Sequence, residues 1–156
     1  MCLLQGYASV AYGKQASLHT NFNRILAAYP GNILIPALHT VCRATYRLAV
    51  QADVETQSKD STKLQNAATI IQESFSRTIN DRLEYDPSAP YSEEGSKKAG
   101  VLFIVNQLFS IYFRLNTLRL CKNLLRPVET RNLHEKSSKS QMVTYRYYVG
   151  RLYMFE

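Results

Sequence analysis

Apolar residues recur along this chain in steps of three and four, which is the spacing of one face of an α-helix. No run alternates apolar and polar residues as a half-buried β-strand would. The pattern therefore predicts an all-α fold. The expected helices span residues 17–29, 32–53, 61–83, 97–115, 118–126 and 138–156, and a partly formed helix is expected at 3–13.

Proline and glycine mark the expected connections between these helices. Pro127 is predicted to stop the fifth helix, and residues 128–136 are predicted to be a loop. Residues 84–96 include two prolines and a glycine, so they are predicted to form a loop, the one internal linker that the sequence offers. We expect this loop to lie within one helical-repeat domain that spans residues 1–156.

The helix at residues 97–115 is apolar on nearly every face, which predicts a place at the centre of a helical stack. In the last helix, Gly150 has the small-residue spacing that lets paired helices approach closely in tetratricopeptide-type repeats. The predicted core residues of these two helices are Val101, Val105, Leu108, Phe109, Tyr112, Gly150 and Tyr153.

Length and composition narrow the class of protein. A chain of 156 residues with 46% apolar residues is long enough to bury one core. No uncharged apolar run reaches about 18 residues, so we expect no membrane span. The N-terminus lacks the basic segment of a signal peptide. Cys2, Cys42 and Cys121 are odd in number and widely spaced, which favours reduced thiols in the cytosol or nucleus.

The positive charge is concentrated in the second part of the chain. Residues 95–156 hold eleven Lys and Arg and three Glu, whereas residues 1–94 hold eight basic and nine acidic side chains. Such a segment suits RNA, DNA or an acidic protein partner, although a solvated helix surface has the same composition. The candidate contact residues are Arg119, Lys122, Arg126, Arg131, Lys136, Lys139, Arg146 and Arg151.

Tyrosine and arginine alternate in residues 145–151 of the last helix. This pairing can stack bases and neutralise phosphates on single-stranded RNA. Helix packing is the alternative, because Tyr145 and Tyr148 share a face with Leu152. The pattern therefore leaves RNA contact by this segment open.

The sequence offers little for catalysis. His39 and Cys42 are three residues apart on one helix, but a zinc site needs two further ligands, which no CxxC or HxxxH motif supplies. We therefore interpret them as a core thiol beside a hydrogen-bonded histidine. No phosphate-binding loop and no serine-nucleophile motif is present. We expect no enzyme activity, catalytic residue, cofactor, metal or small-molecule substrate.

Three segments contain sequence motifs of a known family. They are residues 100–116, which include Val105-Asn-Gln-Leu-Phe109, residues 118–126, and residues 141–151 with Tyr145-x-Tyr-Tyr-x-Gly-Arg151. They resemble the helical-repeat half of the PCI (proteasome lid, signalosome, initiation factor) family. The resemblance extends to the family's subunit of the nuclear transcription-and-export mRNA complex and to its signalosome-like sister.

This resemblance implies a right-handed stack of antiparallel helix pairs. It also implies that the chain is an N-terminal or internal fragment of a longer protein, without the family's C-terminal winged helix. The implied function is a scaffold that couples transcription to mRNA export in the nucleus, in part at the nuclear pore, with some protein in the cytoplasm. The implied partners are a larger PCI-type scaffold subunit, a small acidic subunit, and RNA or DNA.

Two other functions remain open from the sequence. One is a signalosome-like PCI paralogue linked to splicing, whose repeat half is similar. The other is a free-standing RNA-binding helical repeat.

Overall fold

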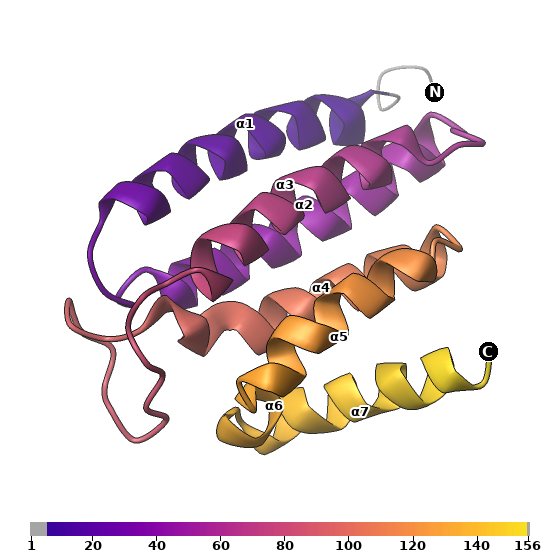
Figure 1. The fold of residues 1–156 in the computed structure, drawn as a ribbon. Helices are drawn as coiled ribbons and strands as arrows, with labels where there is room; N and C mark the ends of the chain where they lie inside the picture. The colour runs from indigo at the N-terminus through magenta and orange to yellow at the C-terminus, as the bar shows by residue number, and fades with distance from the viewer. Residues whose placement is uncertain (1–5, 156) are drawn as a thin grey trace.

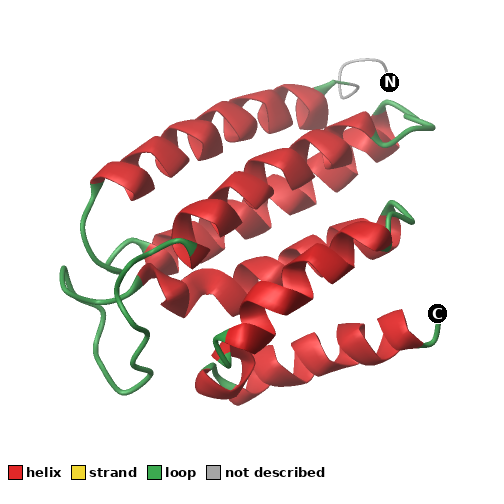
Figure 2. Ribbon diagram, viewed as in Figure 1, coloured by secondary structure: helices red, strands yellow, loops and turns green. Residues whose placement is uncertain are grey.

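The computed structural model describes residues 6–155, and this part of the chain contains helices and no strand (Figures 1 and 2). Successive long helices run in alternating directions, and the stack extends from α1 at one end to α7 at the other, with α2 behind α3 and α5 in front of α4 (Figure 1). The prediction of an all-α helical stack is confirmed. The elements are α1 (Tyr7–Ala28), α2 (Ile35–Glu55), α3 (Thr62–Ile79), the 3₁₀ turn η1 (Lys97–Gly100), α4 (Val101–Arg114), α5 (Arg119–Thr130), α6 (Leu133–Lys136) and α7 (Lys139–Tyr153).

Helix α1 is continuous from Tyr7 to Ala28, so the expected break between residues 13 and 17 was wrong. Residues 3–5 of the expected first helix lie outside the described residues. Gly13 lies in the helix on its exposed side, where glycine costs only about 0.5–1 kcal/mol relative to alanine. The carboxylate of Glu55 accepts hydrogen bonds from the backbone N–H groups of Gly6 (2.7 Å) and Ser9 (3.0 Å). A residue about fifty positions away thus stabilises the start of α1, which local sequence patterns do not reveal.

A second carboxylate stabilises the start of α3. Asp53 accepts hydrogen bonds from the backbone N–H groups of Lys63 (3.0 Å) and Leu64 (2.8 Å), while the Ser61 side chain makes no capping bond. At its other end α3 stops at Ile79, four residues before the predicted Leu83. Asp53 therefore ties α2 to α3 through the orphan donors of a helix N-terminus.

The loop at residues 84–96 is held against the turn between α1 and α2. The backbone N–H of Ser92 donates to Asn32 Oδ1 (2.7 Å), and the backbone N–H of Asn32 donates to the Ser92 carbonyl (3.0 Å). Gly31 has a φ of +73°, and a Cβ there would overlap the backbone of Ser92. Just after the loop, the Lys97 ammonium donates to the Leu26 carbonyl (2.6 Å). The loop is therefore anchored to the first two helices.

Helix α5 passes through Pro127 and continues to Thr130, so the prediction that Pro127 ends the helix was wrong. Proline removes one helical hydrogen bond. Leu124, three residues before Pro127, and Val128, directly after it, are buried in the core and hold the last turn in place. The predicted loop at 128–136 likewise contains the short helix α6, whose Leu133 is buried.

Helix α4 lies at the centre of the stack and packs against α2, α3, α5 and α7 (Figure 1). Its apolar residues face all of these neighbours, as expected for a helix that is apolar nearly all round. The buried set includes Val101, Val105, Leu108, Phe109 and Tyr112, each at most 5% exposed.

Gly150 and Tyr153 lie outside the core, so the expectation that they are core residues was wrong. Tyr153 is 59% exposed, and a Cβ added to Gly150 would meet no atom within 4 Å. Helix α7 packs on the core through Tyr145 and Leu152, which are buried on the side of the helix away from Gly150 and Tyr153. Within residues 6–155, no helix approaches α7 at Gly150.

Replacing Gly150 with alanine is expected to raise the free energy of unfolding by about 0.5–1 kcal/mol, because Ala loses less backbone entropy on folding. Urea unfolding of the variant measures this change. Gly95→Ala is the contrasting control, since a Cβ there would overlap the Asn32 side chain and should destabilise the protein. A loss of stability for Gly150→Ala would instead support the close helix approach expected from sequence.

Candidate functional site

Helix α5 presents Arg119, Lys122 and Arg126 to solvent on one face. Steps of three and four place these residues above one another on the helix surface. The opposite face is buried through Cys121, Leu124 and Val128. Because the apolar face packs on the core, Arg119, Lys122 and Arg126 point outward, as the sequence pattern predicted.

The other candidate basic residues follow along the chain towards α7. Arg131 caps the C-terminus of α5, Lys136 ends α6 and Lys139 begins α7, and all three are exposed. Arg146 is also exposed, two helical turns after Lys139. We call the seven residues Arg119, Lys122, Arg126, Arg131, Lys136, Lys139 and Arg146 the basic face.

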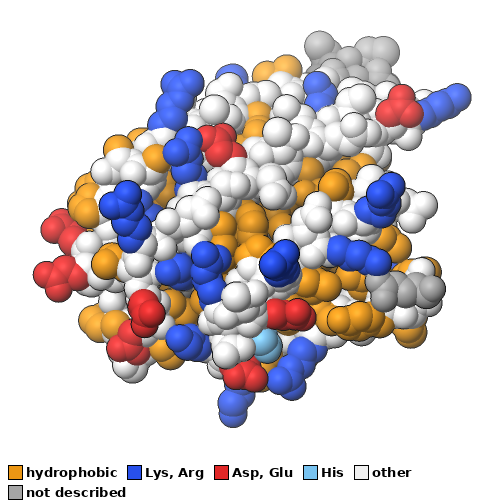
Figure 3. All heavy atoms as spheres, viewed as in Figure 1, with side chains coloured by type: hydrophobic (Ala, Val, Ile, Leu, Met, Phe, Trp, Pro, Cys, Tyr) orange, Lys and Arg blue, Asp and Glu red, His pale blue; other side chains and the backbone are white. Residues whose placement is uncertain are grey.

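Two acidic side chains lie in the same segment and moderate its charge. Glu129 and Glu135 are exposed, and Glu135 Oε1 lies 3.9 Å from His134 Nε2. Red and blue side chains accordingly alternate over the lower front of the molecule (Figure 3). The basic face is therefore a positive surface with acidic interruptions.

Arg151 does not belong to this open surface, which corrects its assignment as a contact residue. Its guanidinium lies 4.7 Å from the ring centroid of Phe113 and 5.6 Å from that of Tyr147. Its Nη1 donates to the Tyr147 hydroxyl at 3.4 Å. Such cation–π contacts are worth about 0.5–2 kcal/mol. Arg151 thus helps to hold α7 on α4.

The tyrosines of α7 divide into two groups. Tyr145 is buried against Phe109, with ring centroids 5.9 Å apart, and Tyr148 packs 5.3 Å from Phe113. Tyr147 is 57% exposed and lies one helical turn before Arg151, whose guanidinium contacts its ring. Helix packing explains Tyr145 and Tyr148, whereas Tyr147 remains accessible for stacking.

A groove of about 640 Å³ lies between α3 and α5. Its apolar lining includes Ala68, Leu115 and Leu120, and orange side chains fill the space between α3 and α5 in Figure 3. Lys59 and Arg114 also line it. The sequence did not single out these two residues, because only the tertiary fold brings the α2–α3 connection next to the end of α4.

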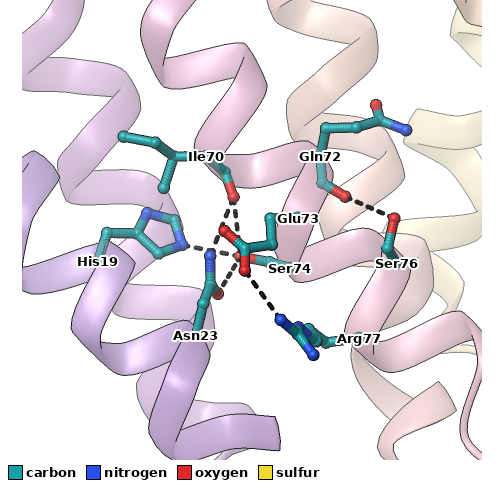
Figure 4. Close-up of polar contacts among 8 residues, drawn as sticks. All are labelled: His19, Asn23, Ile70, Gln72, Glu73, Ser74, Ser76 and Arg77. Carbon is teal, nitrogen blue, oxygen red and sulfur yellow. Dashed lines mark hydrogen bonds and ion pairs between the residues drawn. The ribbon is translucent and has the colours of Figure 1, made fainter.

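A buried polar network joins α1, α2 and α3, and Figure 4 shows the part of it that links α1 to α3. His19 Nδ1 lies 2.8 Å from Thr45 Oγ1, and His19 Nε2 lies 2.8 Å from Ser74 Oγ. The Ser74 hydroxyl donates to Asn23 Oδ1 (2.7 Å), so its oxygen accepts the Nε2 proton of His19. Asn23 Nδ2 donates to the Ile70 carbonyl (3.1 Å). Burial lowers the pKa of His19 to about 4, so the ring is neutral at pH 7.

His39 and Cys42 turn towards different neighbours. The His39 ring stacks on Phe103 at 4.1 Å, and its buried Nε2 has no hydrogen-bond partner. Cys42 Sγ lies 3.8 Å from Nε2 of His19. The expectation of a hydrogen-bonded His39 beside Cys42 was therefore wrong, because His19 fills that role from another helix.

The thiols of Cys42 and Cys121 are buried and unbonded to one another, whereas Cys2 lies outside the described residues. Burial raises the pKa of Cys42 to about 12 and that of Cys121 to about 11, so both stay protonated. Residues 6–155 contain no cluster of three or more His, Cys, Asp or Glu side chains suited to a metal ion. None of the helices in this range has the length and apolar character to cross a bilayer.

No family model matches this chain, but its sequence is similar to those of known proteins. It is 34% identical over 151 residues to PCI domain-containing protein 2 of Xenopus laevis, covering 94% of this chain and 36% of that protein. It is 33% identical over 160 residues to the CSN12 homolog of Mycosarcoma maydis, covering 93% of this chain and 33% of that protein.

Part of the chain is more similar still. Over 63 residues, or 40% of this chain and 16% of the relative, it is 52% identical to PCI domain-containing protein 2 of Danio rerio. The chain spans about a third of the length of the Xenopus and Mycosarcoma relatives. These similarities and the all-α helical stack show that the chain belongs to the PCI-domain family.

Proposed function

We propose that this chain is the helical scaffold segment of a nuclear complex that couples transcription to mRNA export. It holds protein partners and contacts RNA as a secondary role. The observation that carries this proposal is the basic face, whose seven Lys and Arg are all exposed on α5, α6, α7 and the turn after α5 of a PCI-family helical stack. Its proposed location is the nucleus, in part at the nuclear pore, with some protein in the cytoplasm.

The proposed partners are a larger PCI-type scaffold subunit and a small acidic subunit. An acidic surface matches the positive charges of Arg119 and Arg126, and the exposed apolar Leu120 lies between them in sequence. Charge complementarity of this kind speeds association and selects partners. The rigid core below α5 keeps these side chains in fixed positions.

RNA contact is supported by the side chains next to the same surface. Exposed Tyr147 offers an aromatic ring beside exposed Arg146. Aromatic stacking and phosphate neutralisation together bind single-stranded RNA without strong sequence preference. We therefore assign RNA a secondary role beside protein assembly.

The alternative function is that of a signalosome-like PCI paralogue linked to splicing. The observation that favours it is the similarity to CSN12 homologs, which covers 93% of the chain. Both functions use the stack as a scaffold, and they differ in the partners that it holds.

Reversing two charges on α5, Arg119→Glu with Arg126→Glu, is expected to weaken binding of single-stranded RNA by the full-length protein. Two lost phosphate contacts should reduce the slope of log K against log salt by about 1.4. Fluorescence anisotropy with a labelled oligonucleotide at several salt concentrations measures both effects. Recovery of the acidic subunit from nuclear extract should fall in parallel.

The matched control reverses two exposed arginines elsewhere, Arg47→Glu with Arg82→Glu, which produces the same change in net charge. This control should retain most RNA affinity and its partners. Equal behaviour of both double variants would contradict a role for the basic face. Mass spectrometry of proteins bound to the full-length protein decides between export and splicing subunits.

A further inference from the structure

The outer side of α1 carries large apolar residues in contact with solvent. Tyr7 is 67% exposed, Val10 61%, Leu18 50%, Ile25 53% and Tyr29 40%. With Lys14 and Asn21 between them, these positions follow one another in steps of three and four. They therefore lie along one side of the helix, interrupted by Lys14 and Asn21, and Tyr29 follows the last helical residue, Ala28. We call the five apolar residues the α1 stripe.

The α1 stripe lies opposite the side of α1 that builds the core. Tyr12, His19, Asn23 and Leu26 face α2 and α3 and are buried. Helix α1 lies at the edge of the stack, with α2 and α3 on one side of it and no described element on the other (Figure 1). A helix with apolar residues on both sides is typical of one that is covered on both sides.

The charges in and next to the line of the stripe indicate what covers it. Helix α1 contains Lys14 and Arg24, both exposed, and no Asp or Glu. On the neighbouring α3, Glu73 is paired with Arg77 at 3.2 Å. Glu55 of α2 is bonded to the backbone at the start of α1. The charge available to an incoming surface on α1 is therefore positive.

A second copy of the chain would be a poor match for this surface. Two α1 stripes packed together would bring Lys14 and Arg24 of both copies into one interface, and like charges there oppose association. A helix with acidic flanks would instead carry charges complementary to both residues.

We propose that the α1 stripe binds an amphipathic helix of a protein partner, with apolar residues on one face and acidic residues beside it. The apolar face packs on the five stripe residues, and its carboxylates approach Lys14 and Arg24. Helix α1 has 22 residues and is about 33 Å long, which suits a partner helix of several turns. This surface is separate from the basic face, so the inference does not depend on the proposed function.

The test uses the full chain and a labelled 18-residue peptide with leucines in steps of three and four and glutamates beside them. Fluorescence anisotropy should show saturable binding. A scrambled peptide of the same composition, and a peptide with lysine in place of glutamate, should each bind about tenfold more weakly. Leu18→Ser with Ile25→Ser should weaken binding of the acidic peptide about tenfold.

Two further variants separate apolar contact from charge. Leu120→Ser with Val143→Ser replaces exposed apolar residues on α5 and α7, at the other end of the stack from α1 (Figure 1), and should leave binding unchanged. Lys14→Glu with Arg24→Glu should reverse the preference, so that the lysine peptide binds more tightly than the glutamate peptide. Circular dichroism should show unchanged helix content in all variants, because the substituted side chains are exposed.

Three results would overturn the inference. The first is equal binding of the acidic and scrambled peptides, and the second is equal binding by the Leu18→Ser/Ile25→Ser variant and the parent chain. The third is a dimer in sedimentation velocity that the same variant abolishes, which would assign the stripe to a second copy. None of these results bears on Arg119 and Arg126, so the proposed function is tested independently.

Discussion

Lowering the pH from 7 to 4 is expected to reduce the free energy of unfolding by several kcal/mol. Burial lowers the pKa of His19 and of His39 from 6.5 to about 4 in the folded protein. Between these values the unfolded chain binds more protons than the folded chain, so stability falls as the pH falls. Each histidine contributes about 3 kcal/mol across this window. Urea unfolding followed by circular dichroism at intervals of pH measures the change.

The interval between pH 6.5 and pH 5 reports mainly on these histidines. Hydrogen bonds lower the pKa of Glu55 from 4.5 and that of Asp86 from 3.8, so the stability that those carboxylates contribute is lost only at lower pH. The variant His39→Phe keeps a ring beside Phe103 and removes one titrating group. It should reduce the pH dependence by about half. A stability that stays constant from pH 6.5 to pH 5 would contradict the prediction.

Truncating Phe109 to alanine is expected to reduce the free energy of unfolding by about 3–5 kcal/mol. Phe109 is 1% exposed, and its ring lies 5.9 Å from that of Tyr145 and 5.7 Å from that of Tyr148. The substitution removes the aromatic contact between α4 and α7 and leaves a cavity between them. Chemical denaturation measures the loss, and hydrogen exchange should show that the amides of α7 lose protection first.

Phe155→Ala is the matched control, because Phe155 is also a phenylalanine but is 63% exposed. Its effect should stay within about 0.5 kcal/mol. If both substitutions cost the same, Phe109 does not link α4 to α7. If the Phe109 variant also binds RNA more weakly, the position of α7 matters to the basic face.

Sequence periodicity predicted most of the helices and the part of the basic face that lies on α5. Arg119, Lys122 and Arg126 could be assigned to one side of a helix because Cys121, Leu124 and Val128 occupy the other side. The central place of α4 followed from apolar residues on nearly all its faces. Local spacing is sufficient for such features, since each depends on residues within a few turns.

Helix boundaries depended on contacts that are distant in sequence. Glu55 stabilises the start of α1 and Asp53 the start of α3. Burial of Leu124 and Val128 outweighed the tendency of Pro127 to end α5. These interactions are worth a few kcal/mol together, which is enough to override the local preference of a glycine or a proline.

The sequence alone determined the helical class, the central α4 and the outward direction of the basic residues on α5, because these follow from the 3.6-residue period of the helix. Only the tertiary structure decided that His19, rather than His39, lies beside Cys42, and that Arg151 packs on Phe113. It also decided that the outer side of α1 remains uncovered by residues 6–155. Each of these depends on which helices become neighbours, and that is set by packing across the whole stack.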